Sequence, residues 1–383
     1  MDIDNNYNII NNDYNNNQNK ILFLKIYNSI VLRNEISRHI KLFNLYHKAK
    51  FTIKKSLLEY TYREYIKELE IDFNEELNNY NDIPSSVTHL SFLNSFNMPI
   101  NHRTIPPDVT SLVFGDSFTG SLQHLPPSIR VLKLGSRFSQ LIESLPISLT
   151  ELTLGKSFSQ EFKPGLIPSN VVTLILGEQF NHQILPQALP NSITSLTFDK
   201  IYNKEFLMGS IPNSVTTLSF INQSQFNKEI KSGILPQSLT MLSLGRCFNQ
   251  YIMPNVLPQS LTHLSFGDKF NQPLLHKDIL PPNLTYLSFG VKFNQVIKEY
   301  ILPMSLTSLV FGSDFKKILP PDDIIVPPSI TTITFKKNTY TGDKEKIKRI
   351  LTERNLAITK ALEKNNKNSS MMNSWKSRVN KIQ

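Results

Sequence analysis

Apolar and polar positions alternate along most of this chain in a pattern that returns about every 22 residues. The clearest unit is Leu257–Gln272, in which Leu261, Leu264 and Phe266 stand at the spacing i, i+3, i+5 and Phe270 follows. A repeat of this length predicts stacked units that bury their apolar side chains against one another. Each unit is marked by one proline: Pro84, Pro106, Pro126, Pro146, Pro168, Pro190, Pro212, Pro236, Pro258, Pro281, Pro303 and Pro327.

The middle of the unit predicts a short β-strand. Alternation places Leu264 and Phe266 inward and His263 and Ser265 outward. The i, i+3, i+5 spacing is typical of leucine-rich repeats, and the proline in the return path leaves no room for a full helix. We therefore predict a mainly β fold, a leucine-rich-repeat-like parallel β solenoid of about 12 repeats over residues 81–340.

Three sets of recurring residues are expected to hold the coils in register. Gly267 and its equivalents are interpreted as turn residues with positive φ. The Asn after the second ring of each unit, and a Thr at the strand start, are interpreted as hydrogen-bonding ladders. Two inward ladders consist of Phe92, Phe114, Leu134, Leu154, Leu176, Phe198, Phe220, Leu244, Phe266, Phe289, Phe311 and Phe335, and of Phe96, Phe118, Phe138, Phe158, Phe180, Tyr202, Phe226, Phe248, Phe270, Phe293 and Phe315.

The segments outside the repeats differ in composition. Residues 1–19 are rich in Asn, which predicts a disordered tail. Residues 20–80 contain no Pro or Gly and have apolar residues at helical spacing, which predicts two to four short helices. Helical spacing over 343–363 predicts a helix that caps the last repeat, and 364–383 is expected to be a loosely ordered basic tail.

Charge separates the repeats from the C-terminal end. The formal net charge is +10, but residues 336–383 contain 13 Lys and Arg against 4 Asp and Glu, so the repeat region is nearly neutral. Binding to nucleic acid or to an anionic membrane is therefore expected only through the basic tail. The chain has one cysteine, no signal-peptide pattern and no transmembrane segment, which predicts an intracellular, cytoplasmic protein.

Catalytic motifs are absent from the sequence. There is no phosphate-binding Gly-Lys-Ser/Thr loop and no Cys/His cluster for zinc. His89 and His263 occupy the same outward position, but they belong to the first and ninth repeats, too far apart to share a metal ion. We expect no enzyme activity, no cofactor and no metal site.

The variable outward positions are the candidates for binding a protein partner. Met241, His263 and Tyr286 fall on consecutive repeats, about 5 Å apart per step. Adaptable and aromatic side chains are common anchors in interfaces, which makes these three the first candidates. The alternative interpretation is that they are ordinary solvent-exposed strand residues.

The combination Phe-Asn-Gln, Leu-Pro-x-Ser-Leu-Thr and Leu-x-Phe-Gly, seen in 257–272 and its copies, resembles the FNIP repeat found in social amoebae and some giant viruses. That resemblance implies a leucine-rich-repeat-like fold and a role in protein–protein interaction. Some members carry an N-terminal F-box, which gives an alternative: a substrate receptor of a ubiquitin ligase whose residues 20–80 recruit the adaptor. An F-box usually opens with Leu-Pro, whereas 20–80 has no proline.

Overall fold

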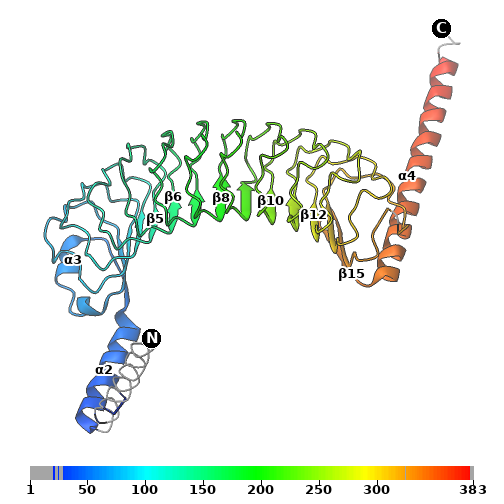
Figure 1. Ribbon diagram of the computed structural model, residues 1–383. Coiled ribbons are helices and arrows are strands. Elements are labelled where there is room, and N and C mark those ends of the chain that lie inside the picture. The colour runs from blue at the N-terminus through cyan, green and yellow to red at the C-terminus, as the bar shows by residue number, and fades with distance from the viewer. Residues whose placement is uncertain (1–19, 22–24, 26–28, 324, 380–383) are drawn as a thin grey trace, which may run out of the picture.

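The computed structural model describes residues 20, 21, 25, 29–323 and 325–379. In this part of the chain the coils stack into a curved solenoid, with the strands along the concave side and the return segments on the convex side (Figure 1). The predicted parallel solenoid is confirmed. The disorder expected for 1–19 lies outside the described residues.

All strands of the described chain belong to one sheet, and they are ordered along it as they are in the sequence. Neighbouring strands are parallel from β1 to β14. The twelve predicted strands are β3 (His89–Phe92), β4 (Ser111–Phe114), β5 (Val131–Lys133), β6 (Glu151–Thr153), β7 (Thr173–Ile175), β8 (Ser195–Phe198), β9 (Thr217–Phe220), β10 (Met241–Ser243), β11 (His263–Ser265), β12 (Tyr286–Ser288), β13 (Ser308–Phe311) and β14 (Thr332–Phe335).

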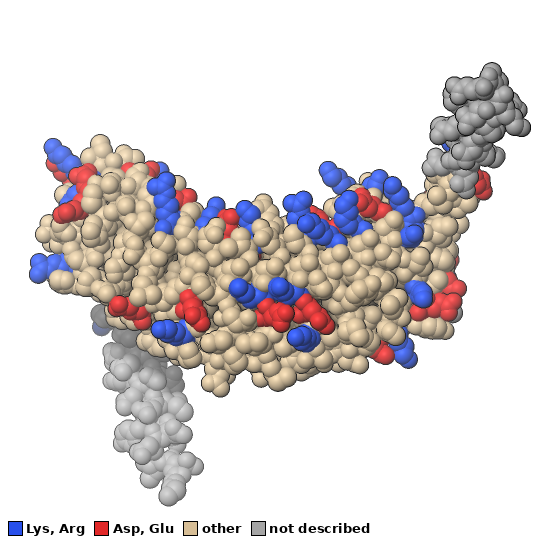
Figure 2. Space-filling model, turned by 90° about the horizontal axis from the view of Figure 1, so that it is seen from above, with Lys and Arg blue, Asp and Glu red and all other residues tan. Residues whose placement is uncertain are grey.

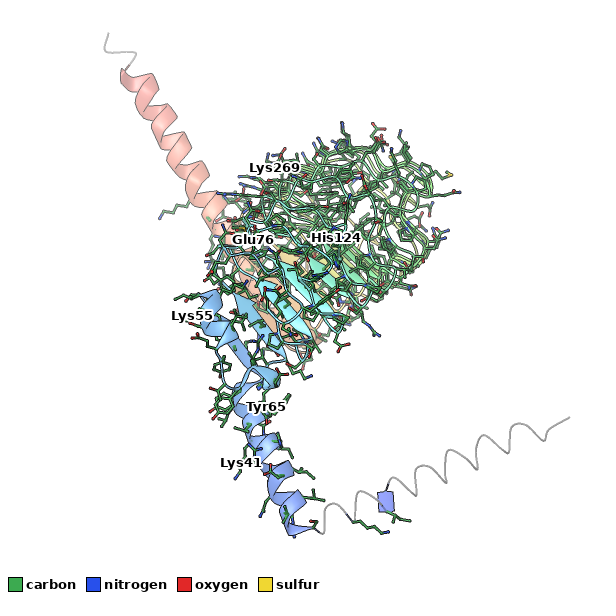
Figure 3. All side chains as sticks on the ribbon, turned by 90° about the vertical axis from the view of Figure 1, so that its left-hand side faces the viewer. Lys41, Lys55, Tyr65, Glu76, His124 and Lys269 are labelled. Atoms are coloured by element: carbon green, nitrogen blue, oxygen red, sulfur yellow. The ribbon has the colours of Figure 1, made fainter. Side chains whose placement is uncertain are left out.

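The N-terminal segment is only partly helical. Helix α2 (Ile30–Tyr46) extends away from the solenoid, and Lys41 is labelled on it in Figure 3. Two short helical turns follow, α3 (Lys54–Leu58) and η1 (Arg63–Tyr65). Two strands, β1 (Lys48–Phe51) and β2 (Glu68–Ile71), also lie in this segment and start the sheet, which the prediction of two to four short helices did not include. The strands form because their inward side chains continue the core of the first repeat.

The C-terminal end closes with a reversed strand and a helix. β15 (Asn338–Thr341) pairs antiparallel with β14, and α4 (Lys344–Val379) continues beyond residue 363, where the sequence had predicted a loosely ordered tail. The base of α4 packs through the buried Ile347 and Leu351. Arg354 lies over the Phe335 ring at 4.1 Å and donates hydrogen bonds to two carbonyl groups of the preceding coil. The predicted cap is thus present and longer than expected.

The predicted ring ladders form the core. Along the second ladder, ring centroids in consecutive coils are 6.0 to 6.2 Å apart from Phe226 through Phe270. Within one coil the rings of Phe266 and Phe270 stack at 3.9 Å. These phenyl groups are almost completely buried. In the second ladder, Phe226, Phe248 and Phe270 each stack on a ring of the coil before and on a ring of the coil after. Core packing therefore couples neighbouring coils directly.

Three polar ladders satisfy the backbone between coils. Asn Oδ1 groups accept the backbone N–H of the equivalent Asn in the next coil at 2.8 to 2.9 Å, as predicted, at Asn203, Asn227, Asn249, Asn271 and Asn294. Thr hydroxyls donate to the Thr carbonyl one coil earlier, as at Thr240 and Thr262. A third ladder was not predicted: Ser hydroxyls donate to a carbonyl of the preceding coil at 2.6 to 2.7 Å, at Ser192, Ser214, Ser238, Ser260, Ser305 and Ser329.

The glycines after the strands have a different role from the one predicted. Gly267 has no positive φ, whereas Gly165, Gly209 and Gly233, which lie in other turns, do. A Cβ atom on Gly267 would lie 2.1 Å from the carbonyl oxygen of Gly245 in the previous coil. Glycine is therefore needed there because two backbones come too close for any side chain.

Candidate interaction surface

Two outward side chains per strand cover the concave face of the sheet. The first outward position of each strand is in register with the first of its neighbours, and the second with the second, so the face consists of two straight rows. Inward side chains such as Leu264 are fully buried between these rows and the ring ladders. Because the backbone holds the rows, side chains on adjacent coils lie directly beside each other.

The structure brings Met241, His263 and Tyr286 together in the first row, on β10, β11 and β12. The His263 and Tyr286 rings stack with centroids 5.7 Å apart. The His263 Nδ1 atom lies 2.9 Å from the hydroxyl of Thr262, which belongs to the Thr ladder. Met241 is 45% exposed, so its thioether and the two rings form a contiguous surface with apolar character.

The trio lies within a longer face that has no charged side chain. From β7 to β14 none of the outward strand residues is Asp, Glu, Lys or Arg. Most are Ser or Thr, all are exposed or half-buried, and they flank the trio on both sides: Thr173, Ile175, Ser195, Thr197, Thr217, Ser219, Ser243, Ser265, Ser288, Ser308, Val310, Thr332 and Thr334. We call these residues, with the trio, the uncharged face.

Charge returns at the N-terminal end of the same sheet. Lys48 on β1 pairs with Glu68 on β2 at 3.0 Å, and that hydrogen bond lowers the pKa of the Glu68 carboxyl. Lys50 pairs with Asp72 at 3.0 Å, and hydrogen bonds from Ser95 and then Lys50 lower the pKa of Asp72. The two ends of the sheet therefore present different chemistry: ion pairs on the first coils and hydroxyl groups on the later ones.

A polar cavity of about 340 Å³ adjoins the trio at the ends of β10–β12. It is lined by the hydroxyl-bearing residues Ser243, Ser265 and Ser288 of the second row and by Gly267 and Gly290. Arg246 and Asp268 also line it, with the Arg246 Nε atom 3.7 Å from the Asp268 Oδ2 atom. The cavity supplies hydrogen-bonding groups beside the apolar trio, a combination suited to binding a polypeptide.

The described residues contain no group of three or more His, Cys, Asp or Glu side chains placed to hold a metal ion. His89 and His263 lie on β3 and β11 of the same row. In the same part of the chain, no helix is both long enough and apolar enough to cross a bilayer.

Sequence reasoning proposed the trio among the first outward positions of the strands but did not consider the second outward row beside it. The signal was present in the second outward position, where Ser or Thr recurs after the inward Leu, as in Leu218-Ser219 and Leu264-Ser265. Only the inter-strand register shows that these residues form one continuous row with the trio beside it.

The fold and its ladders define a leucine-rich-repeat-like solenoid. The FNIP repeat family matches six stretches that together cover more than half of the chain, and the protein belongs to this family: residues 96–137, 138–179, 180–223, 226–269, 270–303 and 293–338. A FNIP repeat-containing protein of Dictyostelium discoideum is 36% identical over an alignment of 119 residues, and the match covers 28% of this chain and 22% of that relative.

Among solved structures, the chain is similar to CroV588, described as a novel circular LRR protein. The two are 39% identical with a TM-score of 0.67, over 72% of this chain and 41% of the other. The chain thus spans less than half of the length of either of these two relatives.

Proposed function

We propose that the protein is a non-enzymatic scaffold that binds a protein partner on the uncharged face, with Met241, His263 and Tyr286 at the centre of contact. The observation that carries this proposal is the in-register trio, partly exposed and surrounded by hydroxyl groups on a concave sheet. Concave repeat surfaces offer an extended binding area, and centrally placed aromatic side chains contribute most of the energy of typical interfaces.

The absence of charge from this face makes a prediction about its partner. A surface without Lys, Arg, Asp or Glu gains nothing from long-range attraction, so its partner should present a neutral surface of hydroxyl, amide and apolar groups. Binding should then change little between about 50 and 500 mM salt, because screening acts on charges. Binding through the basic residues of 336–383 would instead weaken steeply with salt.

The test is quantitative affinity purification of the full chain with the triple variant Met241→Ala, His263→Ala and Tyr286→Ala. For a partner that binds the uncharged face, the amount captured by this variant should fall at least about tenfold relative to the native chain. The control is a triple variant of the same row on β4–β6: Ser111→Ala, Val131→Ala and Glu151→Ala. If the trio variant retained every partner of the native chain, or if both triple variants lost the same partners, the proposal would be wrong.

The alternative of an F-box-like substrate receptor gains no support from the family matches, which begin at residue 96. Residues 48–51 and 68–71 also join the solenoid sheet as β1 and β2. Co-purification of an adaptor and a cullin with the full chain, lost on removal of 20–46, would favour that alternative.

A further inference from the structure

A second surface lies at the other side of the molecule, between α4 and the return turns of the last coils. A groove of about 910 Å³ opens there, the size of a pocket that can bury several side chains. Its walls are Val296 and Tyr300 from the turn before β13, Ile318 from the turn after it, and Ile358 and Leu362 from α4. Val296, Ile318 and Leu362 are each about half exposed, at 57%, 46% and 54%.

The groove exists because the apolar stripe of α4 is longer than the solenoid it covers. Ile347 and Leu351 are buried against the last coil, and the Asn355 side chain then bonds to both the N–H and the carbonyl of Leu319. Beyond this contact the same stripe continues through Ile358 and Leu362 with open space beneath it. A helix normally buries such a stripe against another element.

Tyr300 is the most unusual residue of this groove. Its φ is 61°, in the left-handed region, although a bulky side chain disfavours that conformation. It lies three residues before the repeat proline, a turn position with positive φ in other coils at Gly165, Gln187, Gly209, Gly233 and Asn255. Here alone among those turns a large aromatic ring replaces a small or polar residue, and it is 63% exposed. Backbone strain combined with an exposed ring points to a function for that ring.

The rim of the groove is basic. Lys298, Lys316 and Lys317 line it beside a single acidic residue, Glu299. In the described part of the chain none of these three lysines pairs with a carboxylate within 4.0 Å, and the nearby ion pair joins Lys292 to Asp314 instead. Figure 2 shows Lys and Arg side chains over the later coils on the convex face, with a smaller number of acidic side chains among them.

We propose that this groove binds an amphipathic helix of a partner protein, with apolar side chains packed against Tyr300 and Leu362 and acidic side chains facing the lysines. Helix-in-groove recognition uses such an apolar stripe with charges on its borders. Helix α2 of a second copy also exposes apolar residues, such as Ile36 and Ile40. Its net charge is +2, however, so the lysine rim would repel it, and charge selects an acidic partner.

The experiment measures fluorescence polarisation of two labelled synthetic helices on the full chain. Both have leucines at i, i+3, i+4 and i+7; one has glutamates at the other positions and the second has lysines. The acidic helix should bind, and the basic helix should bind at least about tenfold more weakly. Replacing Lys298, Lys316 and Lys317 together by Glu should reverse this preference.

Tyr300→Gly separates binding from folding. Glycine relaxes the left-handed backbone, so the melting temperature should stay the same or rise, while affinity for the acidic helix falls at least about tenfold. The matched control is Asn255→Gly, the same turn position outside the groove, which should leave affinity unchanged.

Four results would overturn the proposal. The first is no binding of the acidic helix at millimolar concentration, and the second is equal binding of the acidic and the basic helix. The third is equal affinity of the acidic helix for the native chain and for the Tyr300→Gly variant. The fourth is a dimer of the native chain in light scattering that Tyr300→Gly dissociates, since the occupant would then be a second copy.

Discussion

Gly267 shows how closely the coils of this solenoid approach one another. The carbonyl oxygen of Gly245 fills the space that a side chain at Gly267 would need, and Gly290 stands in the same relation to Gly267. The row of glycines therefore fixes the spacing at one edge of the sheet, beside the cavity at the ends of β10–β12.

Substitutions at Gly267 test close approach against backbone conformation. Gly267→Ala and Gly267→Asn should both lower the free energy of unfolding by about 2 kcal/mol, because either Cβ atom clashes with a backbone oxygen. The control Gly233→Asn, at a turn with φ of 78° and no crowding, should cost less than about 1 kcal/mol. Urea unfolding measures both. If Gly267→Asn were tolerated and Gly267→Ala were not, glycine would be needed there for a positive φ and not for close approach.

Tyr202 is the one tyrosine in the second ring ladder. It is 1% exposed, and its hydroxyl has no hydrogen-bond partner among the described residues. Burial raises the pKa of this phenol far above its ordinary value, so the group stays neutral and keeps its polar hydrogen in an apolar core. An unsatisfied buried hydroxyl costs stability.

Tyr202→Phe should therefore raise the free energy of unfolding by about 1 kcal/mol, because the ring is retained and the unpaired hydroxyl is removed. The reverse change in the neighbouring ladder position, Phe180→Tyr, should lower it by a similar amount; the two rings are 6.1 Å apart. Thermal unfolding of both variants provides the measurement. A destabilised Tyr202→Phe variant would show that the hydroxyl is satisfied in solution.

At the scale of elements, Asp82 links α3 to the turn before the first repeat through hydrogen bonds. Its side chain is 5% exposed and accepts hydrogen bonds from Lys54 Nζ at 3.0 Å and from the Asn79 backbone at 3.2 Å. Burial alone would raise the pKa of this carboxyl, but these hydrogen bonds outweigh it and the pKa is lowered. Lys54 also donates to the Glu76 carbonyl, so one ammonium group joins α3 to the turn before the first repeat.

Because the pKa of Asp82 is lowered in the folded state, its stabilising effect is present above the unfolded value of about 3.9 and is lost as pH falls through the folded value. Lys54→Met should lower stability by about 3 kcal/mol at pH 7, since a buried carboxylate loses its partner. On acidification, the free energy of unfolding of the variant should then fall by less than that of the native chain. Lys55→Met is the control, because Lys55 is exposed. Equal pH dependence of the two proteins would exclude this role for Lys54.

Elements that belong to the periodic repeat were predictable, and the strands that precede it were not. The i, i+3, i+5 pattern around Leu264 set the twelve strands and their inward faces, and the Asn ladder followed from its position after the ring. β1 and β2 were missed because four-residue strands such as Lys48–Phe51 lack the prolines that mark the repeats. For the trio, the sequence predicted the three residues, whereas stacking of His263 on Tyr286 required coordinates.

At the scale of the whole molecule, the two ends of the sheet differ in how the edge strand is protected from pairing with another chain. At the C-terminal end β15 runs antiparallel to β14, through a turn in which Lys336 has a φ of 60°, and α4 packs beside it. At the N-terminal end the first strand, β1, presents Lys48 and Lys50. Charged side chains, reversed strands and covering helices all discourage pairing with another chain.

Deletion of residues 336–383 should make the chain aggregate more readily than the full chain, because the hydrogen-bonding edge of β14 becomes free. Static light scattering of freshly purified protein gives the measurement. Deletion of 364–383 alone is the control, since it keeps β15, Ile347, Leu351 and Arg354 in place. A truncated chain of 1–335 that remained monodisperse would show that the edge is protected by other means.

The reversed direction of β15 affects whether further coils can stack on the end of the solenoid. Coils stacked in parallel with identical rings and amides above one another have the same internal order as an amyloid filament, in which each layer is a template for the next. Because β15 points the other way, the parallel stacking ends at β14, and the last strand does not present the template that a further parallel coil would need. End-to-end growth of a filament from this edge is therefore disfavoured.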